Sequence, residues 1–150
     1  MGKWISHSGW YPNFRQPQLF RKNMMTYDLK PVHEGFISHS KQKIGVLKNP
    51  IWQIPFKNTE EILHKANRYS SLGVQKLQDK NVNGSVLKAF LHGSWAFIKH
   101  YFFKLGFLDG GAGFVIAFGN FEGTFYRYVK LTERQSQWQF PSLDPIRKKK

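Results

Sequence analysis

The stretch FFKLGFLDGGAGF, residues 102–114, decides how this chain folds. Asp109-Gly110-Gly111 predicts a sharp chain reversal, because Asp bonds to nearby backbone in turns and Gly tolerates positive φ. Bulky apolar side chains lie on both sides of it. They are Trp95, Phe97, Ile98, Tyr101, Phe102 and Phe103 before the turn, and Phe114, Val115, Ile116, Phe118 and Phe121 after it. The pattern predicts a helical hairpin built for an apolar environment.

Three helices are expected around this turn. Asn58 or Thr59 can cap the first helix, and two acidic residues follow in its first turn. The second helix is expected at residues 85–105 and the third at residues 112–134. At about 100° per residue, a basic strip is expected on the second helix opposite a wide aromatic face. The strip holds Lys88, His92, Lys99 and His100, and the face holds Leu87, Phe90, Leu91, Trp95, Ile98, Tyr101 and Phe102.

In residues 1–57 the sequence pattern predicts loops and short strands. One strand is expected at residues 18–21. Residues 32–37 and 44–47 are expected to pair as a hairpin through a polar link. Pro50 and Pro55 then interrupt regular structure ahead of the first helix. The last segment, residues 135–150, is polar and closes with four consecutive cations, which predicts a basic disordered tail.

The composition of this chain limits the classes of partner that it is expected to bind. Its 150 residues carry a formal charge of +14, and 17% are aromatic, a combination typical of proteins that bind nucleic acid or an anionic membrane surface. Cysteine is absent, which excludes disulfides and thiolate metal sites. The N-terminus lacks the apolar run of a secretory signal. The longest uncharged stretch in the apolar region, residues 110–121, is far shorter than the ~20 residues of a spanning helix. Attachment in the membrane interface is therefore favoured.

Several segments, taken in order, resemble one enzyme family. They are Trp10-Tyr11-Pro12, Leu19-Phe20-Arg21-Lys22, Val32-His33-Glu34, the stretch KANRYSSLG at residues 65–73, and the turn region described above. Together they resemble the C-terminal part of bacterial family 2 glycosyltransferases, in particular those of lipopolysaccharide core biosynthesis. The resemblance spans residues 3–131. It implies an α/β class (an α+β fragment): the C-terminal part of a GT-A-like domain, followed by a membrane-interfacial helical hairpin.

The resemblance divides the chain into three parts. Residues 1–57 would be the acceptor-side remnant of the catalytic domain, residues 58–134 a helical membrane-associated region, and residues 135–150 the tail. Asn67, Arg68 and Tyr69 are expected to join the first two parts by side-chain hydrogen bonds. The implied location is peripheral, at the cytoplasmic face of the inner membrane. The implied partners are an anionic membrane surface and a lipid-linked saccharide acceptor.

The resemblance also assigns the catalytic candidates. An inverting sugar transfer needs a carboxylate beside the acceptor hydroxyl, and Glu34 stands at the position of that base. His33 is the second catalytic candidate, because its ring could approach the donor diphosphate. Arg21 and Lys22 could neutralise the diphosphate as it leaves. Trp10 and Tyr11 could stack on a sugar face.

One half of such an enzyme has no counterpart in these residues. The family holds its nucleotide-sugar with a D-x-D-type motif and a divalent metal, whereas no two Asp residues here lie within ten positions of each other. No cofactor or metal ligand set is therefore expected in this chain, although a divalent metal is implied for the complete enzyme. The prediction is a truncated or split enzyme, inactive alone, that needs a chain supplying the nucleotide-binding half.

Two other hypotheses stay open. The alternative from another class is a small basic nucleic-acid-binding module, which charge and aromatics support. It is not favoured, because RNP, KH and zinc-finger patterns are all missing. The third is a structural protein of the membrane surface without catalysis. The sequence also contains neither an HExxH pair nor a G-x-S-x-G nucleophile motif.

Overall fold

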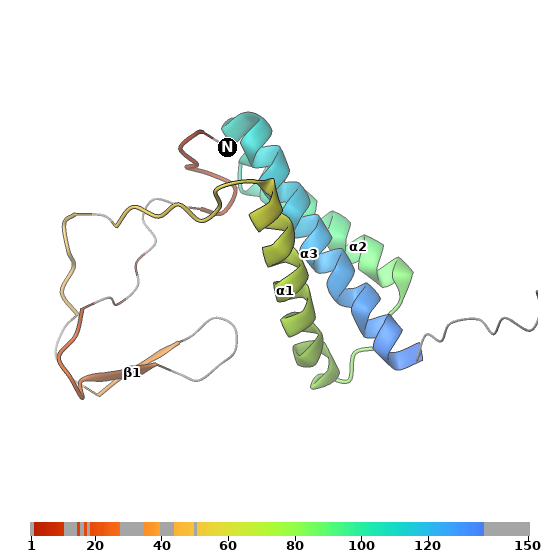
Figure 1. Ribbon diagram of the computed structural model, residues 1–150, viewed down its shortest axis with the longest axis horizontal. Coiled ribbons are helices and arrows are strands. Elements are labelled where there is room, and N and C mark those ends of the chain that lie inside the picture. Colours follow the sequence, from red (N-terminus) through yellow and green to blue (C-terminus); the bar gives the residue numbers. More distant parts are fainter. Residues whose placement is uncertain are drawn as a thin grey trace, which may run out of the picture.

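The computed structural model describes residues 2–10, 15, 17, 19–27, 35–39, 44–49 and 51–136. These residues form a small antiparallel sheet and a helical unit (Figure 1). The strands are β1 (Met25–Tyr27) and β2 (Phe36–Ser38), and the α-helices are α1 (Thr59–Gln78), α2 (Val86–Ile98) and α3 (Gly110–Ser136). A π-helical turn, η1 (Lys99–Phe103), and a 3-10 turn, η2 (Gly106–Asp109), connect α2 to α3. The architecture is thus mixed and mainly helical, as the coarse α+β class predicts.

Side-chain caps fix where the first two helices begin. The Asn58 side chain accepts a hydrogen bond from the Glu61 amide at 2.9 Å, and the Glu61 carboxylate accepts one from the Lys57 amide at 2.7 Å. The Ser85 hydroxyl accepts one from the Lys88 amide at 3.1 Å. The bonds from the Glu61 and Lys88 amides satisfy donors that the first helical turn leaves free, and the Lys57 bond fixes the residue ahead of the first cap. The predicted starts of these two helices are confirmed.

Helix α3 is the centre of the helical unit. Both α1 and α2 pack against it, and they make no contact with each other. In Figure 1, α1 and α3 run in the same direction while α2 runs the opposite way. Fully or nearly fully buried residues lie along α3, and they are mostly small or aliphatic: Gly113, Ile116, Ala117 and Leu131. The residues that α2 buries are Ala89 and Gly93.

The reversal between α2 and α3 is longer than the predicted turn at residues 109–111. It begins at the end of α2, passes through η1, and turns at Leu105, whose φ of +54° is unusual for a bulky residue. Gly110 has a φ of +63°, as the Asp-Gly-Gly motif predicts, but α3 begins there instead of at residue 112. Glycine suits this position because the left-handed region is open to it without steric cost.

The N-terminal strands differ from the predicted ones. Strand β1 pairs with β2, with Tyr27 opposite Phe36. The expected pairing of residues 32–37 with 44–47 is wrong, because residues 44–47 form no strand and their side chains are all exposed. The strand expected at residues 18–21 is also wrong for its described part, residues 19–21. There the chain approaches a turn closed by a bond from the Met24 amide to the Arg21 carbonyl.

The C-terminal boundary also shifts. Helix α3 continues to Ser136, so Gln135 belongs to the helix and not to the predicted tail. Its side chain donates to the Val82 carbonyl and accepts from the Gly84 amide, both at 2.8 Å. These two bonds hold the α1–α2 loop against the end of α3. The rest of the predicted tail, residues 137–150, lies outside the described residues.

Candidate membrane interface

A broad apolar surface covers α2 and the reversal that follows it. We call it the outer apolar surface. It consists of Leu87, Phe90, Leu91, Trp95, Phe102, Phe103, Phe107 and Leu108, whose side chains are between 45% and 69% exposed. Rings within it also contact one another, since Trp95 and Phe103 lie 5.7 Å apart between centroids. Monomeric soluble proteins seldom expose this much contiguous apolar surface, and such surfaces mark protein or membrane contacts.

The contact between α2 and α3 combines small residues with aromatic ones, since Phe97 of α2 packs on Phe114 of α3 with 5.5 Å between ring centroids. A Cβ at Gly93 would lie 3.0 Å from the Phe121 ring, and a Cβ at Gly113 would meet the Gly106 carbonyl. The missing side chain at Gly93 leaves room for the Phe121 ring of α3, and at Gly113 it lets the backbone of η2 approach α3 closely.

The length of the helices limits how they could enter a bilayer. Within the described residues, no single helix is long and apolar enough to cross a membrane. The segments Val86–Phe103 and Gly106–Ser136 pass the test only as a pair, with a bend of 72° between them. By length and composition, this bent pair fits a broken span or a re-entrant loop.

The predicted basic strip of α2 forms in part. Lys88 and Lys99 are exposed, and the Lys88 ammonium donates to the Asn83 carbonyl at 3.0 Å. His92 stacks on Tyr128 with 4.5 Å between ring centroids. His100 departs from the prediction: it is half-buried, and its Nδ1 donates to the Ala96 carbonyl at 2.8 Å. Burial lowers the pKa of His100, which favours the neutral ring there.

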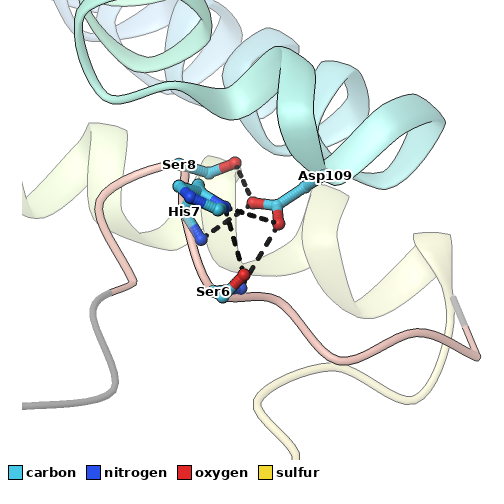
Figure 2. A network of polar contacts seen from close by, with 4 residues as sticks. All are labelled: Ser6, His7, Ser8 and Asp109. Atoms are coloured by element: carbon cyan, nitrogen blue, oxygen red, sulfur yellow. Dashed lines mark hydrogen bonds and ion pairs between the residues drawn. The ribbon is translucent and has the colours of Figure 1, made fainter.

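A buried carboxylate ties the N-terminal segment to the reversal (Figure 2). Asp109 is only 2% exposed. Its carboxylate accepts hydrogen bonds from the Ser8 hydroxyl at 2.9 Å, the His7 amide at 3.1 Å and the Ser6 amide at 3.3 Å. Burial alone would raise the pKa of the Asp109 carboxyl. The bonds from Ser8, Ser6 and His7 outweigh burial and hold this pKa below its ordinary value of 3.8. We call this contact the N-terminal clasp.

The clasp contains Ser, His and Asp side chains but cannot act as a catalytic triad. A triad needs the Ser and the Asp on opposite ring nitrogens of the His. Here the Ser6 hydroxyl and an Asp109 oxygen both approach Nδ1 of His7, at 3.1 and 3.4 Å. The geometry therefore supports a structural role, with the carboxylate as the centre of a ring of donors.

A second polar link joins α1 to α3. The Lys130 ammonium donates to the carbonyl and side-chain oxygens of Asn67 and to the hydroxyls of Ser70 and Ser71, all at 2.7 to 3.0 Å. Burial lowers the pKa of Lys130. Asn67 therefore bonds within residues 58–134, and this bond is not the link to residues 1–57 that the sequence predicts. Arg68 is exposed, and Tyr69 is 43% exposed with its ring 5.8 Å from the Lys65 ammonium.

The predicted sugar-transfer residues are not gathered in one place. Trp10 is half-buried and packs against Phe56 just ahead of α1, with 5.7 Å between ring centroids. Arg21 and Lys22 are exposed in the turn before β1, and neither strand contacts a helix. Figure 1 shows the β1 segment well apart from the helices. The structure therefore does not bring Trp10 to these cations.

Glu34, His33 and Tyr11 lie outside the described residues. Among the residues that are described, no group of His, Asp or Glu side chains could hold a metal ion. No family model matches the chain, and no solved structure matches it.

Proposed function

We propose that residues 58–134 form a module that lies in the interface of an anionic membrane. The observation that carries this proposal is the outer apolar surface, whose eight large apolar side chains on α2 and the reversal after it are each at least 45% exposed. A helix with bulky apolar residues outward and cations beside them binds by burying its apolar side at the level of the headgroups. Residues 58–134 hold ten Lys and Arg against six Asp and Glu, and each Lys or Arg near an anionic surface adds roughly 1 kcal/mol of attraction.

We further propose that the chain is the C-terminal part of a GT-A-like family 2 glycosyltransferase of the lipopolysaccharide-core type. In this proposal the module holds the acceptor side of the catalytic domain at the cytoplasmic face of the inner membrane, next to a lipid-linked saccharide. The sequence resemblance supports the family. The N-terminal clasp supports the coupling, because it fixes residues 6–8 to the reversal between α2 and α3.

The proposed reaction is transfer of a sugar from a nucleotide-sugar to that saccharide. Glu34 would be the general base and His33 its neighbour at the donor, with Arg21 and Lys22 toward the diphosphate and Trp10 and Tyr11 toward the acceptor sugar. The nucleotide-sugar half, with its divalent metal, would come from another polypeptide segment. The proposal therefore assigns no transfer activity to these 150 residues alone.

Vesicle flotation tests the membrane proposal. The chain should float with vesicles containing anionic lipid and less with neutral ones. The variant Leu87→Asn/Phe103→Asn should bind at least tenfold less tightly, since burying one such side chain contributes about 1.5–3 kcal/mol. The matched control is Ile51→Asn/Ile54→Asn, because Ile51 and Ile54 are 72% and 83% exposed but lie outside the outer apolar surface.

Two results would contradict the proposal. One is absence of flotation with either kind of vesicle. The other is equal loss in both double variants, which would make the location of the apolar residues irrelevant. Tight, salt-sensitive binding to single-stranded RNA without vesicle binding would instead favour the nucleic-acid-binding alternative.

A further inference from the structure

A cationic pocket lies between α1 and α3, apart from the residues assigned above. Its volume is about 340 Å³. It is lined by Gly73, Lys76, Leu77, Asp79, Lys80 and Arg127. Three of these residues are cations and one is a carboxylate. The Asp79 carboxylate accepts a hydrogen bond from the Gln75 side-chain amide at 3.0 Å but keeps its charge, so the three cations and one carboxylate leave a net formal charge of +2. The pocket is therefore suited to an anion.

Arg127 supplies the guanidinium of this pocket. Its Nε is buried against Gly73 without a hydrogen-bond partner, so an anion in the pocket would contact the rest of the guanidinium. The Arg127 side chain crosses α1 at Gly73, where an added Cβ would lie 2.8 Å from Arg127 Cδ. Glycine at this position is what lets the guanidinium reach the pocket.

The chemistry of the lining favours phosphate over a carboxylate. Guanidinium groups present parallel N–H donors that match the oxygens of a phosphate, and a phosphomonoester carries nearly two negative charges at neutral pH. The net formal charge of the lining, +2, balances that double charge. We propose that this pocket binds a dianionic phosphate group, carried either by a small molecule in solution or by a lipid headgroup. The proposal does not rest on the membrane association of α2.

Titration of the full chain with inorganic phosphate at about pH 8, followed by ³¹P NMR line width, tests the site in solution. Arg127→Gln should weaken binding about tenfold, as expected for the loss of a charged hydrogen-bond donor. The control is Arg68→Gln, which removes the same charge from an exposed position on α1. Gly73→Ala should also weaken binding, without any change of charge, because the new methyl group displaces the Arg127 side chain. Its control is Gly123→Ala, where a Cβ meets nothing within 4 Å.

If Arg127→Gln does not fold, a second variant still tests the proposal. Lys76→Gln/Lys80→Gln changes two exposed residues of the pocket, and Lys48→Gln/Lys57→Gln changes two exposed lysines elsewhere. Only the first pair should lose phosphate binding. Equal losses in pocket and control variants would mean that net charge alone attracts phosphate, and would overturn the proposal.

Vesicles distinguish the two sources of the phosphate. If the natural ligand is a headgroup, vesicles with phosphatidic acid should bind better than vesicles of equal surface charge with phosphatidylglycerol, and Lys76→Gln/Lys80→Gln should abolish that preference. If inorganic phosphate binds but no preference appears, the ligand is a soluble phosphate compound. Absence of both effects overturns the proposal. Leu87→Asn/Phe103→Asn should keep phosphate binding, so this site and the membrane proposal can fail independently.

Discussion

Asp109 shows at the scale of one residue what local sequence can and cannot predict. The Asp-Gly-Gly triplet indicates a turn, and Gly110 has the positive φ that such a turn uses. The partners of the carboxylate, in contrast, lie more than one hundred residues earlier in the chain. No spacing rule connects positions so far apart, and Ser6, His7 and Ser8 carry no motif of their own. The turn was therefore predictable, and the N-terminal clasp was not.

Asp109→Asn should lower the free energy of unfolding by about 1–3 kcal/mol, because an amide offers one acceptor oxygen where the carboxylate offers two, and it leaves buried donors unsatisfied. Denaturant unfolding followed by circular dichroism measures the loss. The control is Asp79→Asn, which makes the same chemical change at an exposed position. Equal stability of the two variants would contradict the assigned role of the clasp.

The pH dependence of stability in the original chain and in Asp109→Asn gives an independent check. The pKa of Asp109 is lower in the folded chain than its ordinary value of 3.8. Its contribution to stability is therefore complete above that value and disappears as the pH falls through the lower, folded pKa. The difference in stability between the original chain and Asp109→Asn should stay constant from about pH 7 to 5 and shrink in stronger acid. A difference that was already lost between pH 7 and 5 would contradict the low pKa of the Asp109 carboxyl.

At the scale of elements, the helices were more predictable than the strands. Asn58 and Ser85 mark helix starts by local chemistry, which the sequence displays directly. The three-residue strands β1 and β2 have no such signal, and residues 44–47, which were expected to pair in a hairpin with residues 32–37, form no strand. The aromatic face of α2 was also predictable from periodicity. The contact of Gly93 with Phe121 of α3 was not predictable, because no local signal marks that glycine as a contact residue.

Gly113→Ala tests the close approach at the start of α3. An added methyl group would meet the Gly106 backbone, including its carbonyl carbon at 2.8 Å, and backbone cannot easily move aside. We expect a loss of about 1–3 kcal/mol in unfolding free energy, typical of overpacking. Gly123→Ala in the same helix meets open space and should be stabilising by up to about 1 kcal/mol through helix propensity. Thermal unfolding of both variants measures the contrast, and a stabilised Gly113→Ala would refute the packing argument.

At the scale of the whole molecule, two polar links hold the helical unit together: the clasp joins the N-terminal segment to the reversal, and Lys130 joins α3 to α1. The candidate sugar-transfer residues do not lie together on this unit. Trp10 lies beside the start of α1, while Arg21 and Lys22 lie with β1, so linear order alone did not predict which of them are neighbours. A substrate site made of all of them would require a rearrangement or additional chain.

The chain alone is expected to have no measurable affinity for nucleotide-sugars. The reason is chemical: the sequence has no D-x-D motif and no Gly-rich phosphate loop ahead of a helix, so nothing offers a metal-bridged diphosphate its usual ligands. Calorimetry with UDP- and ADP-sugars in the presence of Mn²⁺ makes the measurement, with Mg²⁺ as a second metal. Micromolar binding would contradict the prediction. Weak binding that Arg127→Gln removes would instead belong to the phosphate pocket.

The family proposal predicts that Glu34 is needed for sugar transfer. Joined to a nucleotide-binding half from a related family 2 enzyme, the chain should transfer sugar to a lipid-linked acceptor. In that fusion, Glu34→Gln should lower kcat by about 10²–10⁴-fold, because a positioned general base contributes that much and an amide cannot accept the proton. KM for the acceptor should change little, since the amide keeps the size of the side chain. The control is Glu60→Gln, which makes the same change at an exposed position on α1. If the fusion is active and its Glu34→Gln variant keeps the full rate, Glu34 is excluded as the base. If the fusion binds vesicles but never transfers sugar, the result favours the hypothesis of a structural membrane protein without catalysis.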